Sequence, residues 1–275
     1  MIMDLKRRSL FWMATLFTGA ALSTVAAAQS APMSDMLAIR ASGVLRVAIT
    51  SFDLPAFHRL ANGQLEGPEI DLARQIADAL SIKLEIVSDA KSFDGVVDAV
   101  AGGQADIGIS KLSQTYLRTS RVRFSEAYIT LRHALLFDRS LIAAQSIGKS
   151  PEDALRHFSG RLGALRGSAY VGFARQNFPR APLTELPNWD AAVEALTRGQ
   201  VDAIYRDEFE IKRVLKLRPS LNVKYGAAII TDQTARLSVA ICDNCGKLQE
   251  FINFHLKQVS GTITLKRLLA SDLRD

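Results

Sequence analysis

The feature that most constrains the fold of this chain is an internal repeat. Residues 99–109 and 195–205 read alike, at an offset of 96 positions. The residues that recur are Gly103, Gln104 and Asp106 in the first copy and Gly199, Gln200 and Asp202 in the second. Each copy has the pattern of a helix, a glycine stop and a short apolar strand. Coincidence between two short helix–strand units is the alternative explanation.

A further strand and helix are predicted before each copy. Residues 44–50 have the pattern of an apolar strand, and Asp71 is expected to cap a helix. The apolar residues expected on one face of that helix are Leu72, Ile76, Ala79 and Leu80. In the second copy, residues 161–165 read as the strand and residues 168–178 as the helix. Alternating strands and helices predict an α/β fold with two similar lobes, each with a mainly parallel sheet flanked by helices.

The N-terminus indicates the compartment. Arg7 and Arg8 precede an apolar, charge-free run from Ser9 to Ala27, which ends in small residues. This pattern predicts a secretory signal peptide over residues 1–28, cleaved before Gln29, and therefore a periplasmic protein. A retained membrane anchor is the alternative.

The remaining length suits two lobes. We expect residues 29–130 and 230–275 to form lobe 1 and residues 131–229 to form lobe 2. Two crossing segments, near residues 129–133 and 226–231, would act as the hinge between them. We expect the mature protein to be a monomer.

Composition excludes several classes of partner. The whole chain has a net charge of +6, of which the predicted signal peptide carries about +2 through three basic residues and one acidic residue. The basic residues of the mature chain are scattered, which argues against nucleic-acid binding. The four histidines show no metal-ligand spacing, so we expect neither a metal nor another cofactor.

The two cysteines stand close together. Cys242 and Cys245 are separated by two residues, between an apolar strand that ends at Ile241 and an amphipathic helix that begins at Lys247. In an oxidising compartment they could form a disulfide with each other. A redox motif is the alternative, but the strand–helix–strand unit that usually surrounds such a motif is missing.

Polar residues follow the predicted strands of both lobes. Since ligands of open α/β sheets lie beyond the carboxyl ends of the strands, these residues are expected to face one another across a cleft. Arg118 offers a bidentate donor for a carboxylate, Ser168 lies at the start of a helix, and Asp207 offers an acceptor for an ammonium group. Together they predict a site that holds a zwitterion between the lobes. Taken singly, each residue could also be a surface charge or a helix cap.

Several stretches resemble family 3 of the bacterial extracellular solute-binding proteins, which bind amino acids for ABC transporters. The resemblance covers nearly all of residues 40–270. The stretches that carry it are residues 43–49, 63–73, Thr115 to Arg118 followed by Phe124 to Tyr128, and residues 201–207. Departures from the family pattern include Pro68, Ala127 and Leu117, together with Ala56 and Ala169 near the expected pocket.

The resemblance implies roles for individual residues. Arg118 would bind the α-carboxylate of the ligand and Asp207 its α-ammonium group. Ser168 would contact the same carboxylate from the second lobe. The other implied binding residues are Ser110, Lys111 and Ser113, which follow a strand, and the wall residues Phe93, Phe52 and Asp53. The ligand would be an amino acid or a close analogue, delivered to the membrane permease of an ABC transporter.

Two alternative functions stay open at this point. Relatives with this fold include cyclohexadienyl dehydratases, in which a carboxylic acid protonates a leaving hydroxyl group. Asp53, Asp94 or Glu208 would have to serve as that acid, with a raised pKa. A sensory or accessory binding protein that serves a partner other than a permease is the second alternative. We expect the protein not to be an enzyme.

Overall fold

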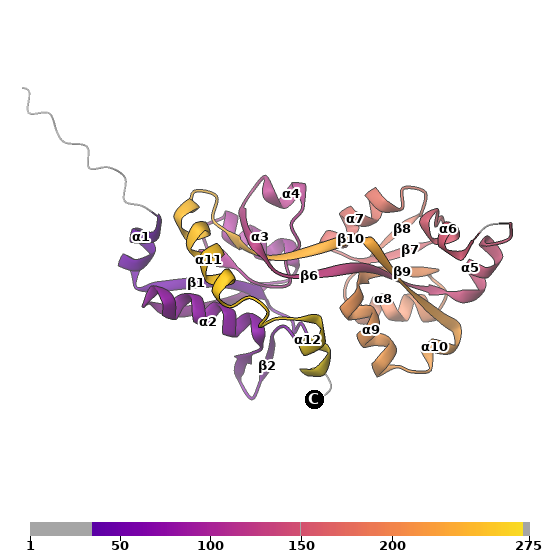
Figure 1. Cartoon of the computed structure of the whole chain (residues 1–275), viewed down its shortest axis with the longest axis horizontal. Helices are drawn as coiled ribbons and strands as arrows, with labels where there is room; N and C mark the ends of the chain where they lie inside the picture. Colours follow the sequence, from indigo (N-terminus) through magenta and orange to yellow (C-terminus); the bar gives the residue numbers. More distant parts are fainter. Residues whose placement is uncertain (1–34, 149, 272–275) are drawn as a thin grey trace, which may run out of the picture. The chain divides into compact units, whose positions relative to one another are not determined.

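The computed structural model describes residues 35–148 and 150–271, which lie within one compact unit. Its centre is an eight-stranded sheet in the order β4-β1-β5-β10-β6-β9-β7-β8 (Figure 1). The predicted signal peptide lies outside the described residues. Among the helices that the structure describes, none combines the length and the apolar character needed to cross a bilayer.

The sheet has two halves, and helices flank each of them. The elements of the first half are α1 (Asp35–Ser42), β1 (Val44–Thr50), β2 (Arg59–Ala61), β3 (Gln64–Glu66), α2 (Pro68–Leu80), β4 (Lys83–Ala90), α3 (Phe93–Ala101), β5 (Ile107–Gly108) and α4 (Tyr116–Thr119). Those of the second half are α5 (Arg139–Gln145), α6 (Pro151–Arg156), β7 (Leu162–Leu165), α7 (Ala169–Asn177), β8 (Leu183–Leu186), α8 (Trp189–Thr197), β9 (Ala203–Asp207), α9 (Glu208–Leu217) and α10 (Leu221–Lys224).

Two long strands join the halves. They are β6 (Arg123–Asp138) and β10 (Tyr225–Ile241), which pair antiparallel along most of their length. In the first half β1 lies parallel to both β4 and β5, and in the second half β7 lies parallel to β8 and β9. The register of β6 and β10 shifts between Ile230 and Thr234, at the end of the segment near residues 226–231 that was expected to cross between lobes. The predicted two-lobed α/β fold is therefore confirmed.

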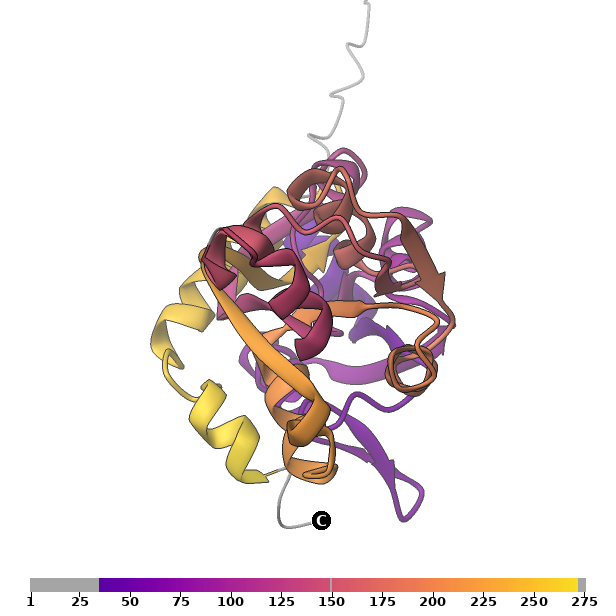
Figure 2. The same ribbon diagram turned by 90° about the vertical axis from the view of Figure 1, so that its right-hand side faces the viewer.

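The two C-terminal helices connect the halves again. α11 (Gly246–Gln258) packs on α1 and β6, whereas α12 (Leu265–Ser271) packs on α9 of the second half. Figure 2 shows these helices along one side of the sheet. The lobe boundaries proposed from the sequence place α12 in lobe 1, and its buried side chain Leu268 belongs to a core with members from both halves, such as Phe124 and Tyr205.

The internal repeat has the same structure in both copies. Gly103 and Gly199 have φ angles of 72° and 70°, which favour glycine because the left-handed region disfavours a Cβ atom. The aspartate that follows each glycine accepts hydrogen bonds from an arginine of the neighbouring strand region. Asp106 binds Arg46 at 2.7 Å, and Asp202 binds Arg161 at 2.7 Å. The repeat thus builds the same strand junction twice.

One predicted helix start was wrong. Asp71 does not cap α2, because that helix begins at Pro68, with Gly67 at its N-cap. Proline suits the first helical turn, where its missing N–H would have no partner in any case. Ala79 was also expected on the buried face but is exposed, whereas Leu72, Ile76 and Leu80 are buried as predicted.

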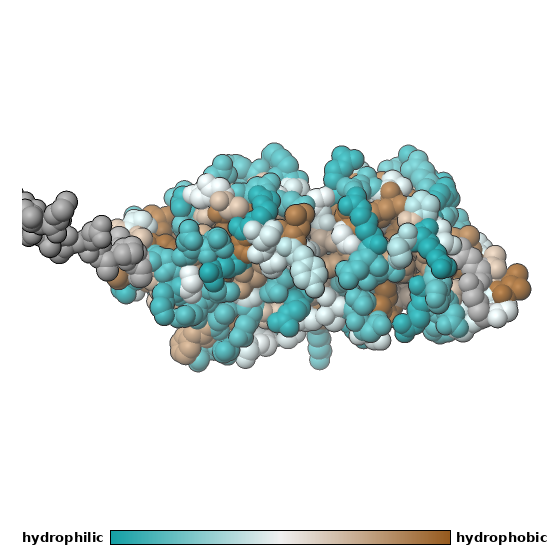
Figure 3. All heavy atoms as spheres, turned by 90° about the horizontal axis from the view of Figure 1, so that it is seen from above, coloured by the Kyte–Doolittle hydropathy of each residue, from teal (hydrophilic) through white to brown (hydrophobic). Residues whose placement is uncertain are grey.

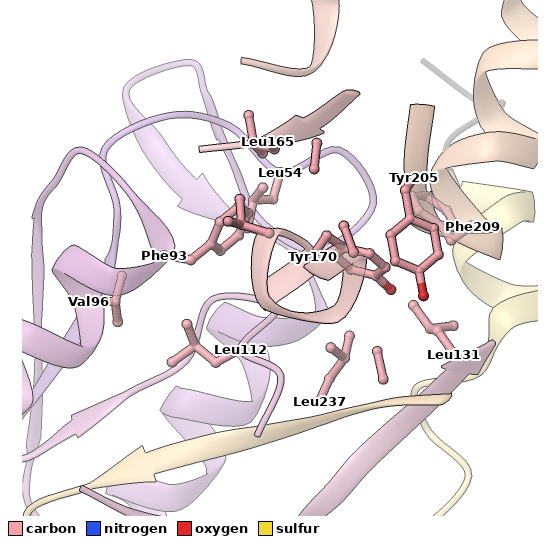
Figure 4. Close-up of a cluster of buried hydrophobic side chains, with 14 of the residues drawn as sticks. Leu54, Phe93, Val96, Leu112, Leu131, Leu165, Tyr170, Tyr205, Phe209 and Leu237 are labelled. Atoms are coloured by element: carbon pink, nitrogen blue, oxygen red, sulfur yellow. The ribbon is translucent and has the colours of Figure 1, made fainter. Parts of the chain in front are cut away.

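Buried apolar residues from both halves meet at the centre. The close-up in Figure 4 shows Phe93 and Leu112 of the first half in one cluster with Leu165, Tyr170 and Tyr205 of the second. The outer surface is different, since hydrophilic side chains cover most of the face shown in Figure 3. The halves therefore meet across a packed, partly aromatic boundary, which is where the predicted binding residues lie.

Candidate functional site

A small cavity lies at the centre of this boundary. Six of the nine predicted binding residues line it, namely Phe93, Lys111, Ser113, Arg118, Ser168 and Asp207; Tyr170, Arg206 and Leu237 are among the remaining wall residues. Its volume is about 10 Å³, room for about one water molecule. A solute could therefore enter only if the halves separate or the side chains rearrange.

 A larger groove adjoins the cavity and shares Phe93 and Arg206 with it. The groove has a volume of about 500 Å³, within the usual range for small-molecule sites, and Phe52 and Asp53 lie on its wall. Five basic and three acidic side chains line the groove, so its electrostatic potential favours anions.

Arg118 is held in the cavity from one side. Its guanidinium group donates to Asp94 Oδ1 through Nε (2.9 Å) and Nη2 (2.7 Å), and Nη1 donates to the carbonyl oxygen of Ser113 (3.0 Å). Burial lowers the pKa of Arg118, the nearby Asp94 opposes that shift, and the positive charge of Arg206 adds to it. Three of the five N–H groups of the guanidinium are thus engaged, which leaves two for another acceptor.

Asp207 already has cationic partners. Lys111 Nζ lies 3.1 Å from Asp207 Oδ2 and 2.7 Å from Glu210 Oε1, and the Lys111 and Asp207 side chains are each only 2% exposed. Arg206 Nε lies 3.6 Å from Asp207 Oδ2. Burial raises the pKa of the Asp207 carboxyl, but Lys111 and Arg206 outweigh that effect and hold the pKa below its ordinary value.

The remaining predicted residues differ in position. Ser168 lies at the N-cap of α7, where its hydroxyl donates to the carbonyl oxygen of Leu165 (2.6 Å). Ser110 is fully buried but is absent from the cavity wall, since its hydroxyl bonds Thr50 of β1. Asp53 Oδ1 accepts a hydrogen bond from the N–H of Leu60 (2.9 Å).

Phe93 and Phe52 form an aromatic wall. Their ring centroids lie 5.8 Å apart, edge to face, and Phe93 is buried whereas Phe52 is 38% exposed. Phe93 also lies 5.1 Å from the guanidinium carbon of Arg206. The wall therefore extends from the groove into the cavity.

Sequence reasoning missed part of the site. Glu210 and Tyr170 were not predicted, although both lie in helices that begin directly beside the predicted residues Asp207 and Ser168. The signal was available in the helical spacing, because Glu210 is one turn after the N-cap Asp207, which accepts a hydrogen bond from its N–H (3.1 Å).

Cys242 and Cys245 form a disulfide with each other. Neither cysteine lies on the wall of the cavity or the groove. Within residues 35–148 and 150–271, no group of three or more histidine, cysteine, aspartate or glutamate side chains is arranged to hold a metal ion.

The comparisons with known proteins agree with this geometry. Residues 45–153 match the model of the bacterial extracellular solute-binding proteins, family 3. An amino acid ABC transporter substrate-binding protein from Streptococcus pneumoniae, solved with L-arginine bound, is 27% identical with a TM-score of 0.68, over 86% of this chain and 97% of that one. An ancestral amino acid-binding protein, described as a precursor of cyclohexadienyl dehydratase, is 27% identical with a TM-score of 0.66, over 86% and 98% of the two chains.

Curated relatives include proteins of different length. A membrane-bound lytic murein transglycosylase F from Pectobacterium atrosepticum is 25% identical over 68% of this chain, which spans only 38% of that relative. The glutamine-binding protein of an ABC transporter from Bacillus subtilis is 25% identical over 64% of this chain and 65% of its own length.

The fold and the central cavity define a protein of the type II periplasmic binding class. Within that class, the resemblance to family 3 of the extracellular solute-binding proteins, inferred from the sequence, is confirmed by the family model and by the solved structures.

Proposed function

We propose that this protein is a periplasmic solute-binding protein that captures a small carboxylate, an amino acid or a close analogue, between its two lobes. The observation that carries the proposal is the position of Arg118. This arginine is only 4% exposed, lies in the short helix α4 of the first half, and lines a cavity whose opposite wall comes from α7 and β9 of the second half. Two N–H groups of its guanidinium are left over beside the ion pair with Asp94, and buried donors of this kind are stabilised by a further acceptor such as a carboxylate.

The proposed mechanism is closure of the lobes on the solute. Residues 131–229 would move relative to the rest of the chain about β6 and β10. Closing the cavity excludes water, which strengthens charge pairs in the lower local dielectric, although desolvation offsets part of that gain. The solute thereby shifts an equilibrium between open and closed forms, and a membrane permease could recognise the closed form.

The relatives support delivery to a transporter. The Streptococcus and Bacillus proteins are both described as binding components of ABC transporters, and the first was solved with an amino acid bound. We therefore propose that the solute is passed to the permease of such a transporter, and that the protein is exported and is not itself an enzyme.

One carboxyl named for the dehydratase alternative is unsuited to that role. Burial raises the pKa of Glu208, but its hydrogen bonds to Arg132 and Lys212 outweigh that effect and lower the pKa to about 2. A general acid needs a pKa nearer the working pH. Asp94 is bound to Arg118, as described above, and Asp53 to a backbone N–H group.

The test is a thermal-shift screen followed by calorimetry. The mature protein would be screened against the twenty amino acids, their 2-oxo acids and simple dicarboxylates. A solute at 100 times its Kd should stabilise the protein by about 2.7 kcal/mol. Arg118→Met should weaken binding of every such solute by about 10- to 100-fold, because a charge-assisted hydrogen bond is lost. Unchanged affinity in this variant would refute the role of Arg118. Turnover of prephenate or arogenate by the unaltered protein would favour the dehydratase alternative.

A further inference from the structure

Lys111 occupies the place where the ammonium group of an amino acid would be expected. Its Nζ lies between Asp207 and Glu210, and it also lies 4.8 and 5.0 Å from the ring centroids of Phe57 and Phe209. A lysine ammonium group has three N–H donors, and carboxylates of the second half accept from it. Asp207 therefore has an ammonium partner that the chain itself supplies.

The backbone fixes Lys111 in this position. Its N–H donates to Glu69 Oε1 (2.6 Å), and Glu69 is in turn bound by His58 (2.8 Å) and by the hydroxyl of Tyr128. Glu69 and His58 are 1% and 2% exposed. A buried network of this kind anchors the loop after β5, so Lys111 is directed at Asp207 by the first half of the protein.

Displacing the lysine side chain would be costly. Its Nζ would leave two carboxylates, Asp207 and Glu210, that are 2% and 6% exposed in their side chains. A single α-ammonium group would then have to satisfy both of them, and the lysine charge would need a new partner. Separating a buried charge pair without replacing it is strongly unfavourable.

Hydrogen-bond donors remain without partners on the same wall. Arg206 is 4% exposed, and its Nε has no hydrogen-bond partner among the described residues. Its guanidinium carbon lies 5.1 and 5.4 Å from the rings of Phe93 and Tyr170. The hydroxyl of Tyr170 is likewise buried without a partner in the described part of the chain, and burial keeps it protonated by raising its pKa.

The two arginines line the same small cavity, so their charges affect each other. The charge of Arg206 contributes to the lowered pKa of Arg118, after burial and against the effect of Asp94. An anion between them would relieve this repulsion and satisfy the donors of both. Because Arg206 also lines the basic groove, an anionic solute could reach it from there.

We infer that the solute is a small carboxylate without an α-ammonium group, such as a dicarboxylate, held by Arg118 and Arg206, with Lys111 in the place of the missing ammonium. This inference rests on the proposed function, because it assumes that a solute binds in the cavity. It names the chemical class of that solute.

Calorimetry with matched compounds tests the inference. Succinate differs from L-aspartate, and glutarate from L-glutamate, only in lacking the α-ammonium group. We expect the compound without the ammonium group to bind at least about tenfold more tightly in each pair. Tighter binding of the amino acid in both pairs overturns the inference but leaves the proposed function standing. If neither these four compounds nor any other compound of the screen binds, the proposed function itself fails.

Two variants test the roles of the basic residues. Lys111→Met removes the ammonium partner of Asp207 and Glu210 and leaves Arg206 as the cation beside Asp207, so the preference should turn toward L-glutamate over glutarate. An unchanged ratio overturns the inference. If that variant does not fold, Arg206→Met should weaken binding of glutarate by about 10- to 100-fold. Arg74→Met, at an exposed ion pair on α2, is the matched control and should bind as the unaltered protein does. Equal affinity of Arg206→Met and the control also overturns the inference.

Discussion

Replacing Lys111 by methionine should destabilise the protein in a way that depends on pH. Methionine has nearly the length of lysine but no charge, so the change leaves Asp207 and Glu210 buried without their shared cation. Removing one partner of a buried charge pair typically costs about 3–5 kcal/mol. For a domain of 150–250 residues, this corresponds to a decrease in Tm of about 6–20 °C near neutral pH.

The sign of the pH dependence follows from Asp207. In the unaltered protein its pKa lies below the ordinary value, so it contributes stability above pH about 4, and this contribution is lost as the pH falls through the lowered pKa. Without Lys111, burial raises the pKa with less opposition, and the folded protein binds a proton more readily. The difference in unfolding free energy between the two proteins should therefore shrink as the pH falls from 7 toward 4.

Urea unfolding at several pH values measures this difference. The control is Arg74→Met, which removes a partner from an ion pair with Asp71 whose side chains are 53% and 60% exposed. Exposed pairs contribute little, so the control should change the unfolding free energy by about 0.5 kcal/mol or less. If Lys111→Met costs no more than the control at pH 7, or if its cost is the same at every pH, the reasoning about the buried charges is refuted.

Two further predictions concern the boundary and the disulfide. Gly167 has a φ angle of 65°, and a Cβ atom there would lie 2.8 Å from Ser92 Cβ. Gly167→Ala should therefore reduce the unfolding free energy by about 1–3 kcal/mol, as measured by urea unfolding. A variant as stable as the unaltered protein would contradict this close approach. Replacing Cys242 and Cys245 together by serine should lower the unfolding free energy by about 2 kcal/mol, the loop-entropy value for so short a loop. The same variant should bind the solute with unchanged affinity in calorimetry. A more than tenfold loss of affinity would show that the disulfide supports the site.

Local patterns predicted the fold well. The repeat around Gly103 and Gly199 identified the helix–strand unit of each half. The glycine that ends the helix and the aspartate that precedes the strand form local structure within a few residues, so their pattern is visible in the sequence. The start of α2 was misplaced for an equally local reason: Pro68 suits the first helical turn, and the φ angle of 121° at Gly67 favours glycine at the N-cap, so the helix begins before Asp71.

The pairing within the site could not be predicted in the same way. The sequence indicated Lys111 and Asp207 separately, but whether a lysine points to water or to a carboxylate depends on how the two halves meet. The residues are 96 positions apart, which is also the offset of the internal repeat. They thus occupy equivalent positions after the repeated strands, but equivalent positions in the two halves need not touch, so the repeat alone did not predict this contact.

The C-terminal helix α12 ties the second half to the segment that packs on the first. It follows α11, which packs on the first half, yet its own contacts are with α9 of the second half, and Leu268 is only 1% exposed. An opening movement about β6 and β10 must either carry α12 with α9, which strains the short connection at residues 259–264, or pull it away. Exposing a fully buried leucine costs about 1.5–3 kcal/mol. Under the proposed closure mechanism, separating α12 from α9 therefore adds to the free energy of opening, at a distance from the solute itself.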